Sequence, residues 1–449
     1  MKKLWSKNEN KSNKLVNEYC FKEGVEFDNS LVIYDVYGSI AHAKMLSKIG
    51  ILNEKEFGKL KINLIKIIDL HNNNSFLIKE EDEDVHTKIE IYLSKKLGSL
   101  GEKIHTGRSR NDQVLVDLRL YSKEKIIDLA VLINQLIDIF IQFAKKYEFI
   151  PMPGYTHMQK AMPSSVGMWA GSFAEQLLDQ LKILKSVYAL NDQSPLGSGA
   201  AYGVSLPIER ELTSKLLGFS KVQNNSLYCQ ASRITAQLFI VNLLVQIMLC
   251  ASRFAQDLLL FTTSEFNFFE VDESICTGSS IMPQKKNLDL MEYVRAKTHV
   301  IIADQQLMAS TVASLPSGYN ADFGQTKGPF IESFNIVFQT IAVLNKTLKL
   351  IKPNKINLLN ACTPEIYATH FAYELVKKGL PFRKAYLIVK DKLNELSTPD
   401  AVSFLKLSNH SGGTNNLKLD SIQKESDDQK NYWENIKQKY ESVINLLLT

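Results

Sequence analysis

The chain has 449 residues, of which 45% are hydrophobic and 22% are charged, so it is long enough for two or three structural units of ordinary folded composition. The net charge is only +5 and the lysines are spread along the whole length, which argues against a nucleic-acid-binding protein and fits a site for an acidic small molecule. The five cysteines are far apart and form no CxxC pair, so we expect a reducing compartment, without a disulfide framework or structural zinc.

The first hundred residues predict short helices on either side of a polar run at 71–84. The N-terminus becomes polar directly after Met1, so we expect no signal peptide. Later in the chain, the most apolar stretch, 238–260, is interrupted by polar residues at helical spacing. That interruption predicts a buried helix and not a membrane span.

Long patterns with helical periodicity dominate the middle of the chain. The pattern at 114–147 is apolar at every third or fourth residue and contains neither Pro nor Gly. Pro163 is well placed to begin the next pattern, which runs to 189. No segment alternates convincingly as a strand would. Further long patterns lie at 230–262, 287–314 and 329–350.

These patterns predict an all-α fold in which long helices form a central bundle. Several of them are apolar on more than one face, which favours a homo-oligomer. Pro353 marks a break, and shorter helical patterns follow at 364–378 and 381–396, then a polar stretch and a final helix at 431–447. We expect three domains, an N-terminal helical one, the bundle and a C-terminal helical one, with the boundaries 1–105, 106–352 and 353–449.

The first of three polar segments is HTGRSRNDQ, at 105–113, directly before the first long helix. Asn111 or Asp112 could cap that helix. A helix N-terminus also holds anions, and arginine adds two-pronged recognition of a carboxylate. Both interpretations, a solvated cap and a carboxylate site that includes Arg110, are open from spacing alone.

The second segment is PGYTHMQ, at 153–159, between two long helices. His157 could be a buried histidine satisfied by a carbonyl group, which is the commoner case for a lone histidine. Its functional interpretation is proton transfer, because the unperturbed pKa is about 6.5. Thr156 could bind a substrate carboxylate.

The third segment is GSSIMPQKKN, at 278–287. Its glycine, proline, hydroxyls and lysines fit either a flexible surface turn or a loop that places an activated hydroxyl beside positive charge. In the second case Ser279 would remove a proton from a carbon next to a carboxylate, with Lys285 stabilising the anion. Glu292 is either an acid favoured near a helix N-terminus or a partner that orients His157.

Together, the three segments resemble the signature regions of the aspartase/fumarase superfamily and, within it, of the argininosuccinate lyase family. The two-lysine form PQKKN resembles the version in that family, whereas fumarases and aspartases carry Gly at the place of Gln284. The resemblance spans roughly residues 30–395. Further matching motifs are DVH at 84–86, SPLGSGA at 194–200, GLPFR at 379–383 and a YNxDxxxxK motif at 319–327.

The resemblance implies reversible cleavage of argininosuccinate into arginine and fumarate by a cytoplasmic homotetramer whose active sites each draw residues from three subunits. It implies Ser279 as the base, Lys285 and Asn287 as stabilisers of the anionic intermediate, and His157 paired with Glu292 in proton transfer or substrate orientation. Neither a metal ion nor an organic cofactor, and neither nucleic acid nor a membrane, is implied. The remaining substrate contacts implied are His86, Ser109, Arg110, Asn111, Thr156, Tyr319 and Lys327.

The chain departs from the family pattern at several positions. WSKN replaces the usual start, and Gly24 lies where an N-terminal serine contact is expected. Leu288 replaces a proline, and Gly324 stands where a glutamine is common, with Gln325 one residue later. Two alternatives therefore accompany the family expectation: adenylosuccinate lyase or another fumarate-releasing lyase, and a structural protein on the same fold without catalysis.

Overall fold

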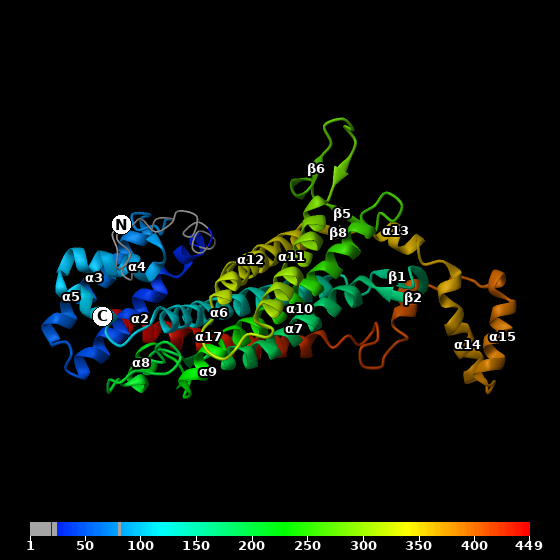
Figure 1. The fold of residues 1–449 in the computed structure, drawn as a ribbon. Helices are drawn as coiled ribbons and strands as arrows, with labels where there is room; N and C mark the ends of the chain where they lie inside the picture. The colour runs from blue at the N-terminus through cyan, green and yellow to red at the C-terminus, as the bar shows by residue number, and fades with distance from the viewer. Residues whose placement is uncertain (1–18, 20–24, 80–81) are drawn as a thin grey trace.

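The computed structural model describes residue 19 and residues 25–79 and 82–449; Cys20 and Gly24 lie outside the described residues. Its centre is a bundle of long helices, with a lobe of short helices at one end and a small helical hairpin at the other (Figure 1). The all-α expectation is confirmed. The five longest helices predicted from periodicity are α6 (Arg110–Lys146), α7 (Val166–Asn191), α10 (Arg233–Phe261), α11 (Asp289–Val312) and α12 (Lys327–Lys349).

The bundle is held by one continuous apolar core. Helix α6 has 37 residues and is therefore about 55 Å long, which sets the length of the molecule's central part. Near its C-terminal end, the Phe140 ring stacks on Phe173 at 5.5 Å and meets Phe254 edge-on at 5.3 Å, so that α6, α7 and α10 are joined by aromatic contacts.

The N-terminal lobe packs against the first half of α6. Within it, α2 contacts both α3 and α6, and buries Ile40 and Leu46. Asn53 caps α3 in a reciprocal pair with Glu56, which fixes where that helix begins. The elements of this lobe are η1 (Glu26–Ser30), α2 (Val32–Lys48), α3 (Glu54–Asn72), α4 (Val85–Leu97), α5 (Ser99–Glu102) and η3 (Lys103–His105).

The last helix returns from the C-terminal region to the bundle. Helix α17 (Leu419–Leu448) packs along α6 and α7, and its Trp433 is fully buried. It begins well before the predicted start at 431, because the polar residues of its first turns face solvent while Leu419 and Ile422 face the core. The shorter elements around it are α8 (Arg210–Leu216), α9 (Ser226–Ala231), η4 (Glu273–Ile275), η5 (Ala321–Thr326), α13 (Lys355–Asn360), η6 (Pro364–Tyr367), α14 (Ala368–Lys377), α15 (Phe382–Asp391), η7 (Leu393–Glu395) and α16 (Ala401–Leu405).

Short two-stranded ribbons connect the helices, which the sequence analysis did not predict. The first ribbon occupies the expected start of the second long helix: Pro163 lies in a strand, and α7 begins instead at Val166, capped by Ser165. The strand pairs are β1 (Pro151–Thr156) with β2 (Gln159–Ser165), β3 (Gln193–Ser194) with β4 (Lys221–Val222), β5 (Phe269–Val271) with β8 (Ile351–Pro353), and β6 (Thr277–Gly278) with β7 (Lys286–Asn287).

Two stretches of helix are long and apolar enough to cross a membrane by length and composition, Arg110–Lys146 and Ser226–Phe261. Most of each is buried inside the structure. Both therefore fit core helices of the bundle, as predicted for the apolar stretch at 238–260.

Candidate active site

The first polar segment forms the N-terminus of α6. Ser109, and not Asn111 or Asp112, is the N-cap: its hydroxyl accepts from the backbone N–H of Asn111 at 3.3 Å. Asp112 completes the reciprocal pair by accepting from the Ser109 backbone N–H at 2.8 Å. The helix thus begins inside the polar segment, with the side chains of Arg110 and Asn111 on its first turn.

Arg110 and Asn111 are both engaged by residues from other parts of the chain. The Arg110 guanidinium donates to Glu83 at 2.5 Å and to the Thr87 hydroxyl at 2.8 Å. The Asn111 carbonyl accepts a hydrogen bond from the buried Arg233. This arginine also lies over the Tyr319 ring, 5.2 Å from its centre. Arg233 therefore links Tyr319 to the start of α6. This arginine was not among the residues predicted from the sequence.

Lys327 is joined to the helix that carries His86. Its ammonium forms an ion pair with the buried Asp28, and the other oxygen of Asp28 accepts from the backbone N–H of Val85 at 3.1 Å. Six of the predicted substrate contacts are thus connected within one chain at this end of the bundle: His86, Ser109, Arg110, Asn111, Tyr319 and Lys327. We refer to them as the arginine-end cluster.

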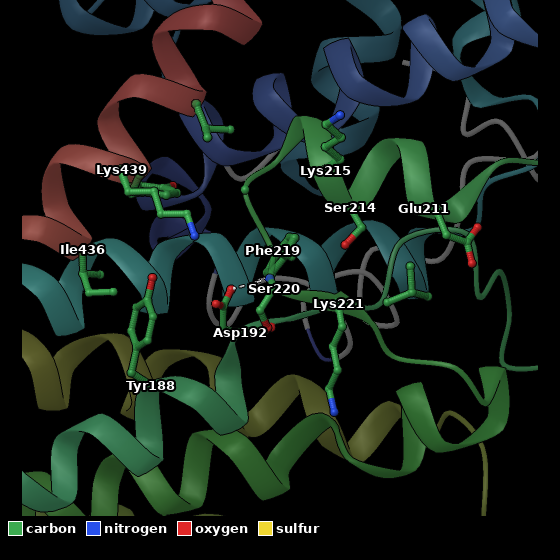
Figure 2. A pocket seen from close by; sticks show the side chains of 14 residues that line it. Tyr188, Asp192, Glu211, Ser214, Lys215, Phe219, Ser220, Lys221, Ile436 and Lys439 are labelled. Atoms are coloured by element: carbon green, nitrogen blue, oxygen red, sulfur yellow. Dashed lines mark hydrogen bonds between the residues drawn. The ribbon is translucent and has the colours of Figure 1, made fainter.

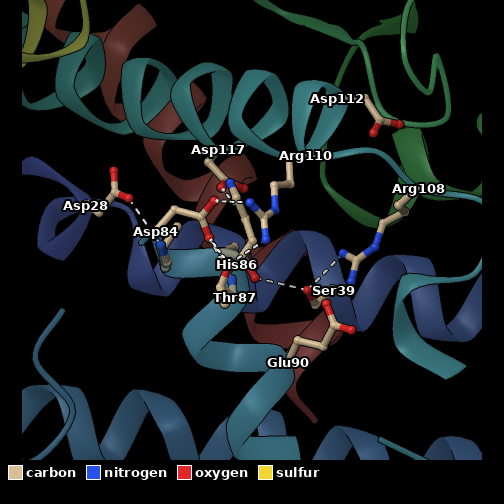
Figure 3. Close-up of polar contacts among 12 residues, drawn as sticks. Asp28, Ser39, Asp84, His86, Thr87, Glu90, Arg108, Arg110, Asp112 and Asp117 are labelled. Carbon is tan, nitrogen blue, oxygen red and sulfur yellow. Dashed lines mark hydrogen bonds and ion pairs between the residues drawn. The ribbon is translucent and has the colours of Figure 1, made fainter. Parts of the chain in front are cut away.

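His86 lies in a buried group of charges between α2, α4 and α6 (Figure 3). Its Nδ1 is hydrogen-bonded to Asp35, and Asp117 is 3.8 Å away. Burial alone would lower the pKa of His86, but the nearby Asp35 and Asp117 charges outweigh it and raise the pKa to about 9. Burial and the Asp35 charge raise the pKa of Asp117 well above its usual value. The ring is therefore an imidazolium at neutral pH.

Asp35, His86 and Asp117 also have the donor types of a metal site, with ligand atoms within 4.8 Å of one another. However, Asp35 is already ion-paired with His86, and the positive charge of the half-buried Arg108 lies close enough to help lower the pKa of Asp35. Two cations thus balance the ionised carboxylate, and we interpret the group as a buried ion cluster. The His86 Nε2 has no hydrogen-bond partner among the described residues, and the substrate contact expected of His86 stays a prediction.

The raised pKa of His86 predicts a pH-dependent stability. A group whose pKa rises on folding stabilises the folded state fully below its unfolded pKa, here 6.5, and this contribution is lost as the pH passes about 9. His86→Gln cannot carry the charge. The difference in free energy of unfolding between the native protein and the variant should therefore be largest below pH 6.5 and shrink towards high pH. Denaturant unfolding at several pH values measures it; a difference independent of pH would contradict the assignment.

Asp112 holds the start of α6 against the loop at 194–200. Its side chain is fully buried, and one oxygen accepts from the backbone N–H groups of Gly197 at 2.9 Å and Gly199 at 3.1 Å. Gly197 has a φ of +86°, and a Cβ there would lie 2.9 Å from Ile208, so the loop needs glycine at this position. The carboxylate thus joins two of the signature motifs.

We expect Asp112→Asn to lower stability by about 1–3 kcal/mol, because the amide nitrogen would face backbone donors that lose their acceptor. Thermal or denaturant unfolding tests this expectation. The matched control is Asp69→Asn, an exposed position on α3, which should change stability by about 0.5 kcal/mol or less. Equal effects at the two positions would contradict the role of Asp112.

The second polar segment is the turn of the β1–β2 hairpin. Thr156 pairs with Gln159, so His157 and Met158 form a two-residue turn, with φ of +52° and +61°. Positive φ at both central positions is the geometry of a type I′ turn, which usually carries Asn or Gly. His157 is exposed at the tip and is not a buried core histidine, so the structural alternative of a histidine satisfied in the core is wrong.

The third polar segment is a hairpin loop that projects from the bundle beside α11 (Figure 1). Strands β6 and β7 close it through the pairs Thr277 with Asn287 and Gly278 with Lys286. Inside the loop, the Ser279 Oγ accepts from the backbone N–H groups of Ile281 at 3.3 Å and Met282 at 3.1 Å. These donors would stabilise negative charge on that oxygen. Lys285 is exposed, whereas Lys286 forms an ion pair with Glu273.

Glu292 lies on the first turn of α11, at a surface cavity of about 900 Å³ between α10 and α11. Its neighbours there include Arg253, Gln256 and His299. Within the part of the chain that the structure describes, Glu292 and His157 form no ion pair. The predicted pairing of His157 with Glu292 is therefore not formed within the described part of one chain.

A single chain keeps the polar segments apart. Ser109 precedes α6 and the hairpin with His157 follows its other end, so they are separated by roughly the helix length of 55 Å. The Ser279 loop projects from the bundle between them (Figure 1). One chain thus presents an arginine-end cluster, an exposed histidine and an exposed serine–lysine loop at separate places.

Comparison with known proteins identifies the family of this chain. A family described as lyase matches residues 9–303. The chain is 41% identical to the argininosuccinate lyase of Thermotoga neapolitana, over 87% of this chain and 98% of that protein, and 38% identical to that of Sorangium cellulosum, over 91% and 95%. The chain belongs to the argininosuccinate lyase family.

Solved structures agree with this family in fold. An EDDS lyase in complex with formate is similar with a TM-score of 0.84, covering 97% of this chain and 94% of that one, at 21% identity. A class II fumarase from Schistosoma mansoni has a TM-score of 0.69 over 83% and 90%, at 16% identity. At these identities the likeness shows the fold alone, and the chain has the helical fold of a fumarate lyase.

Proposed function

We propose that the protein catalyses the reversible β-elimination of argininosuccinate to arginine and fumarate. In this reaction Ser279 removes the proton from the carbon next to the succinyl carboxylate. The electron pair forms the double bond of fumarate while the bond to the guanidino nitrogen breaks, and that nitrogen takes up a proton. Membership in the argininosuccinate lyase family and the presence of all the residues that this chemistry needs support the proposal.

The observation that carries the proposal is the environment of Ser279. Two backbone N–H groups already donate to its oxygen, which is what an alkoxide base requires. Lys285, exposed in the same loop, would balance the second negative charge that develops on the substrate carboxylate, with Asn287 beside it. His157, paired with Glu292, would assist proton transfer to the departing nitrogen or orient the substrate.

We further propose that the active site is assembled from several copies of the chain in a homotetramer. The separation of the three polar segments within one chain supports this, because a substrate the size of argininosuccinate cannot span the length of α6 between the first two of them. The outer face of α10 and α11 also carries exposed apolar side chains, at Phe239, Leu249, Tyr293, Val300 and Leu307, as expected for a surface that another copy covers. Thr156 and the arginine-end cluster would then bind the substrate around the serine loop.

The four cysteines that lie in the described residues are free, which supports a cytoplasmic location. A direct assay separates the proposed reaction from the nearest alternatives. The purified protein is incubated with argininosuccinate and, separately, with adenylosuccinate, and the absorbance of fumarate is followed. Fumarate from argininosuccinate alone is expected. Release from adenylosuccinate would assign a different lyase, and release from neither would favour a structural protein.

A further inference from the structure

Arg233 is the first residue of α10, and its side chain is buried. Within the described residues it forms no ion pair with a carboxylate. Burial lowers the pKa of Arg233 to about 10, so the guanidinium is still charged at neutral pH. Asp112 lies near enough for its charge to act on Arg233, but both oxygens of that carboxylate already accept from backbone N–H groups. Because a buried charge without a counter-charge costs free energy, packing alone does not account for an arginine at this position.

The guanidinium of Arg233 contacts two segments that are distant in the sequence. One of its nitrogens donates to the carbonyl of Asn111, on the first turn of α6, and also to the Gln230 Oε1 at 3.4 Å. Its central carbon lies 5.2 Å from the ring centre of Tyr319 and 5.8 Å from that of Phe323. The centres of these two rings are 5.9 Å apart. One buried cation thus sets the spacing between the start of α6 and the segment that carries Tyr319.

Tyr319 stands in an irregular stretch between α11 and η5, and 43% of its side chain is exposed. The backbone of this stretch is fixed by local hydrogen bonds. The Asn320 side chain donates to the Pro316 carbonyl at 3.1 Å, and the backbone N–H of Phe323 donates to the Asn320 carbonyl at 3.3 Å. These bonds do not orient the Tyr319 ring, which instead contacts Arg233 and Phe323. Arg233 therefore supports one side of a tyrosine whose exposed part is accessible to a ligand.

The proposed reaction assigns Ser279 and Lys285 to the succinyl half of argininosuccinate, which leaves the arginine half to the arginine-end cluster. We infer that Arg233 is a positioning residue for this arginine half, because it holds Tyr319 and the first turn of α6, with Asn111, in the arrangement that binds it. This inference rests on the proposed function. The positive charge behind Tyr319 would also favour the carboxylate of the arginine half. Arg233 itself is buried and is not assigned a contact with the reacting atoms.

Arg233→Met tests the inference, because it removes the charge and the hydrogen-bond donors and keeps an unbranched side chain. Titration calorimetry on the full chain measures the binding of the two products, free arginine and fumarate, separately. The variant should bind free arginine about tenfold more weakly or worse, the loss expected for one hydrogen bond to a charged group, and should bind fumarate nearly as the native chain does. In steady-state kinetics the KM for argininosuccinate should rise more than kcat falls, because Ser279 is untouched.

Lys123→Met is the matched control, because Lys123 is also a buried cation that contacts aromatic rings and a carbonyl. Its ammonium binds Asp192 and the Gly218 carbonyl, and lies 5.6 Å from the ring centre of Tyr188 and 4.8 Å from that of Phe219. Figure 2 shows Asp192, Tyr188 and Phe219 beside a surface cavity between α7, α8 and α17. Lys123→Met should lower thermal stability, since it leaves Asp192 without its cation, but should bind both products like the native chain.

Two further variants keep the test decisive if Arg233→Met does not fold. Arg233→Lys retains the charge, but one ammonium cannot replace the several donors of the guanidinium, so free arginine should again be weakened more than fumarate, to a smaller extent. Adding Tyr319→Leu to either variant should lower the affinity for free arginine by less than the product of the single losses, because both act on the same ring.

Equal weakening of free arginine and fumarate in the Arg233 variants would overturn this inference and leave the proposed reaction standing. The same preferential loss of free arginine in Lys123→Met, or losses that multiply in full in the double variant, would overturn it as well. A native chain that neither releases fumarate from argininosuccinate nor binds free arginine would overturn the proposed function, and this inference with it.

Discussion

Ser279→Ala should keep the fold and lose nearly all release of fumarate from argininosuccinate, by a factor of at least about 10²–10⁴. The substitution removes the oxygen that is proposed to take the proton. It also leaves the backbone donors of Ile281 and Met282 without their acceptor, in a loop that is open to solvent. The fold should not suffer, because this loop packs little against the core. Steady-state kinetics and circular dichroism measure the two effects.

Ser280→Ala is the matched control for Ser279→Ala. It removes a hydroxyl from the next residue, which is exposed and accepts no hydrogen bond from the loop backbone. We expect a far smaller loss of turnover. If Ser279→Ala retained near-native turnover, another group would have to be the base.

His157→Asn should lower turnover by a factor on the order of 10²–10⁴ if the imidazole transfers a proton. Asparagine is suited to this experiment because it adopts positive φ readily and is common in type I′ turns, so the hairpin should be preserved. The loss can then be assigned to the imidazole. Turnover and substrate affinity are measured separately, since a loss in affinity alone would indicate orientation of the substrate.

Met158→Asn controls for the turn itself. It makes a similar substitution at the other central position, where φ is also positive, and leaves His157 in place. Turnover near the native value is expected for this variant. Unchanged turnover in His157→Asn, with normal substrate affinity, would contradict a part for His157 in the chemistry.

The long helices were predictable because their apolar residues recur with the helical period over more than twenty residues. The pattern at 114–147 became α6, whose start moved back to Arg110 because Ser109 and Asp112 form a reciprocal cap within the polar segment. The start of α17 was missed because its first turns are polar and only Leu419 and Ile422 face the core. Periodicity is weak where so few positions are buried.

The β1–β2 hairpin was not predictable from alternation. Three prolines lie in or beside its strands, and the turn His157–Met158 lacks the Asn or Gly that usually marks a type I′ turn. The residues there adopt a conformation that costs free energy. Such strain is often found at functional positions, which agrees with the part proposed for His157.

The residues of the candidate site were proposed from the three polar segments, whereas the partners that surround them in the structure were not predictable. Arg233 stands at the start of an apolar helical pattern, and only a lone charge there could have drawn attention to it. Asp35, Asp117 and Asp28 are buried acids from distant elements, and their roles depend on tertiary contacts. In the proposed homo-oligomer, the arrangement of the segments in one site would depend on contacts between copies, which periodicity along one chain does not specify.

The claim that the site is shared between chains is tested most directly by mixing two inactive variants. Ser279→Ala and Arg110→Ala are each prepared as homo-oligomers, unfolded and refolded together, and the mixed assemblies are verified by native mass spectrometry. If the serine loop and the arginine-end cluster of one site come from different copies, roughly a quarter of the sites in random mixtures contain both native residues, and that share of activity should return. Verified mixed assemblies without activity would contradict the account.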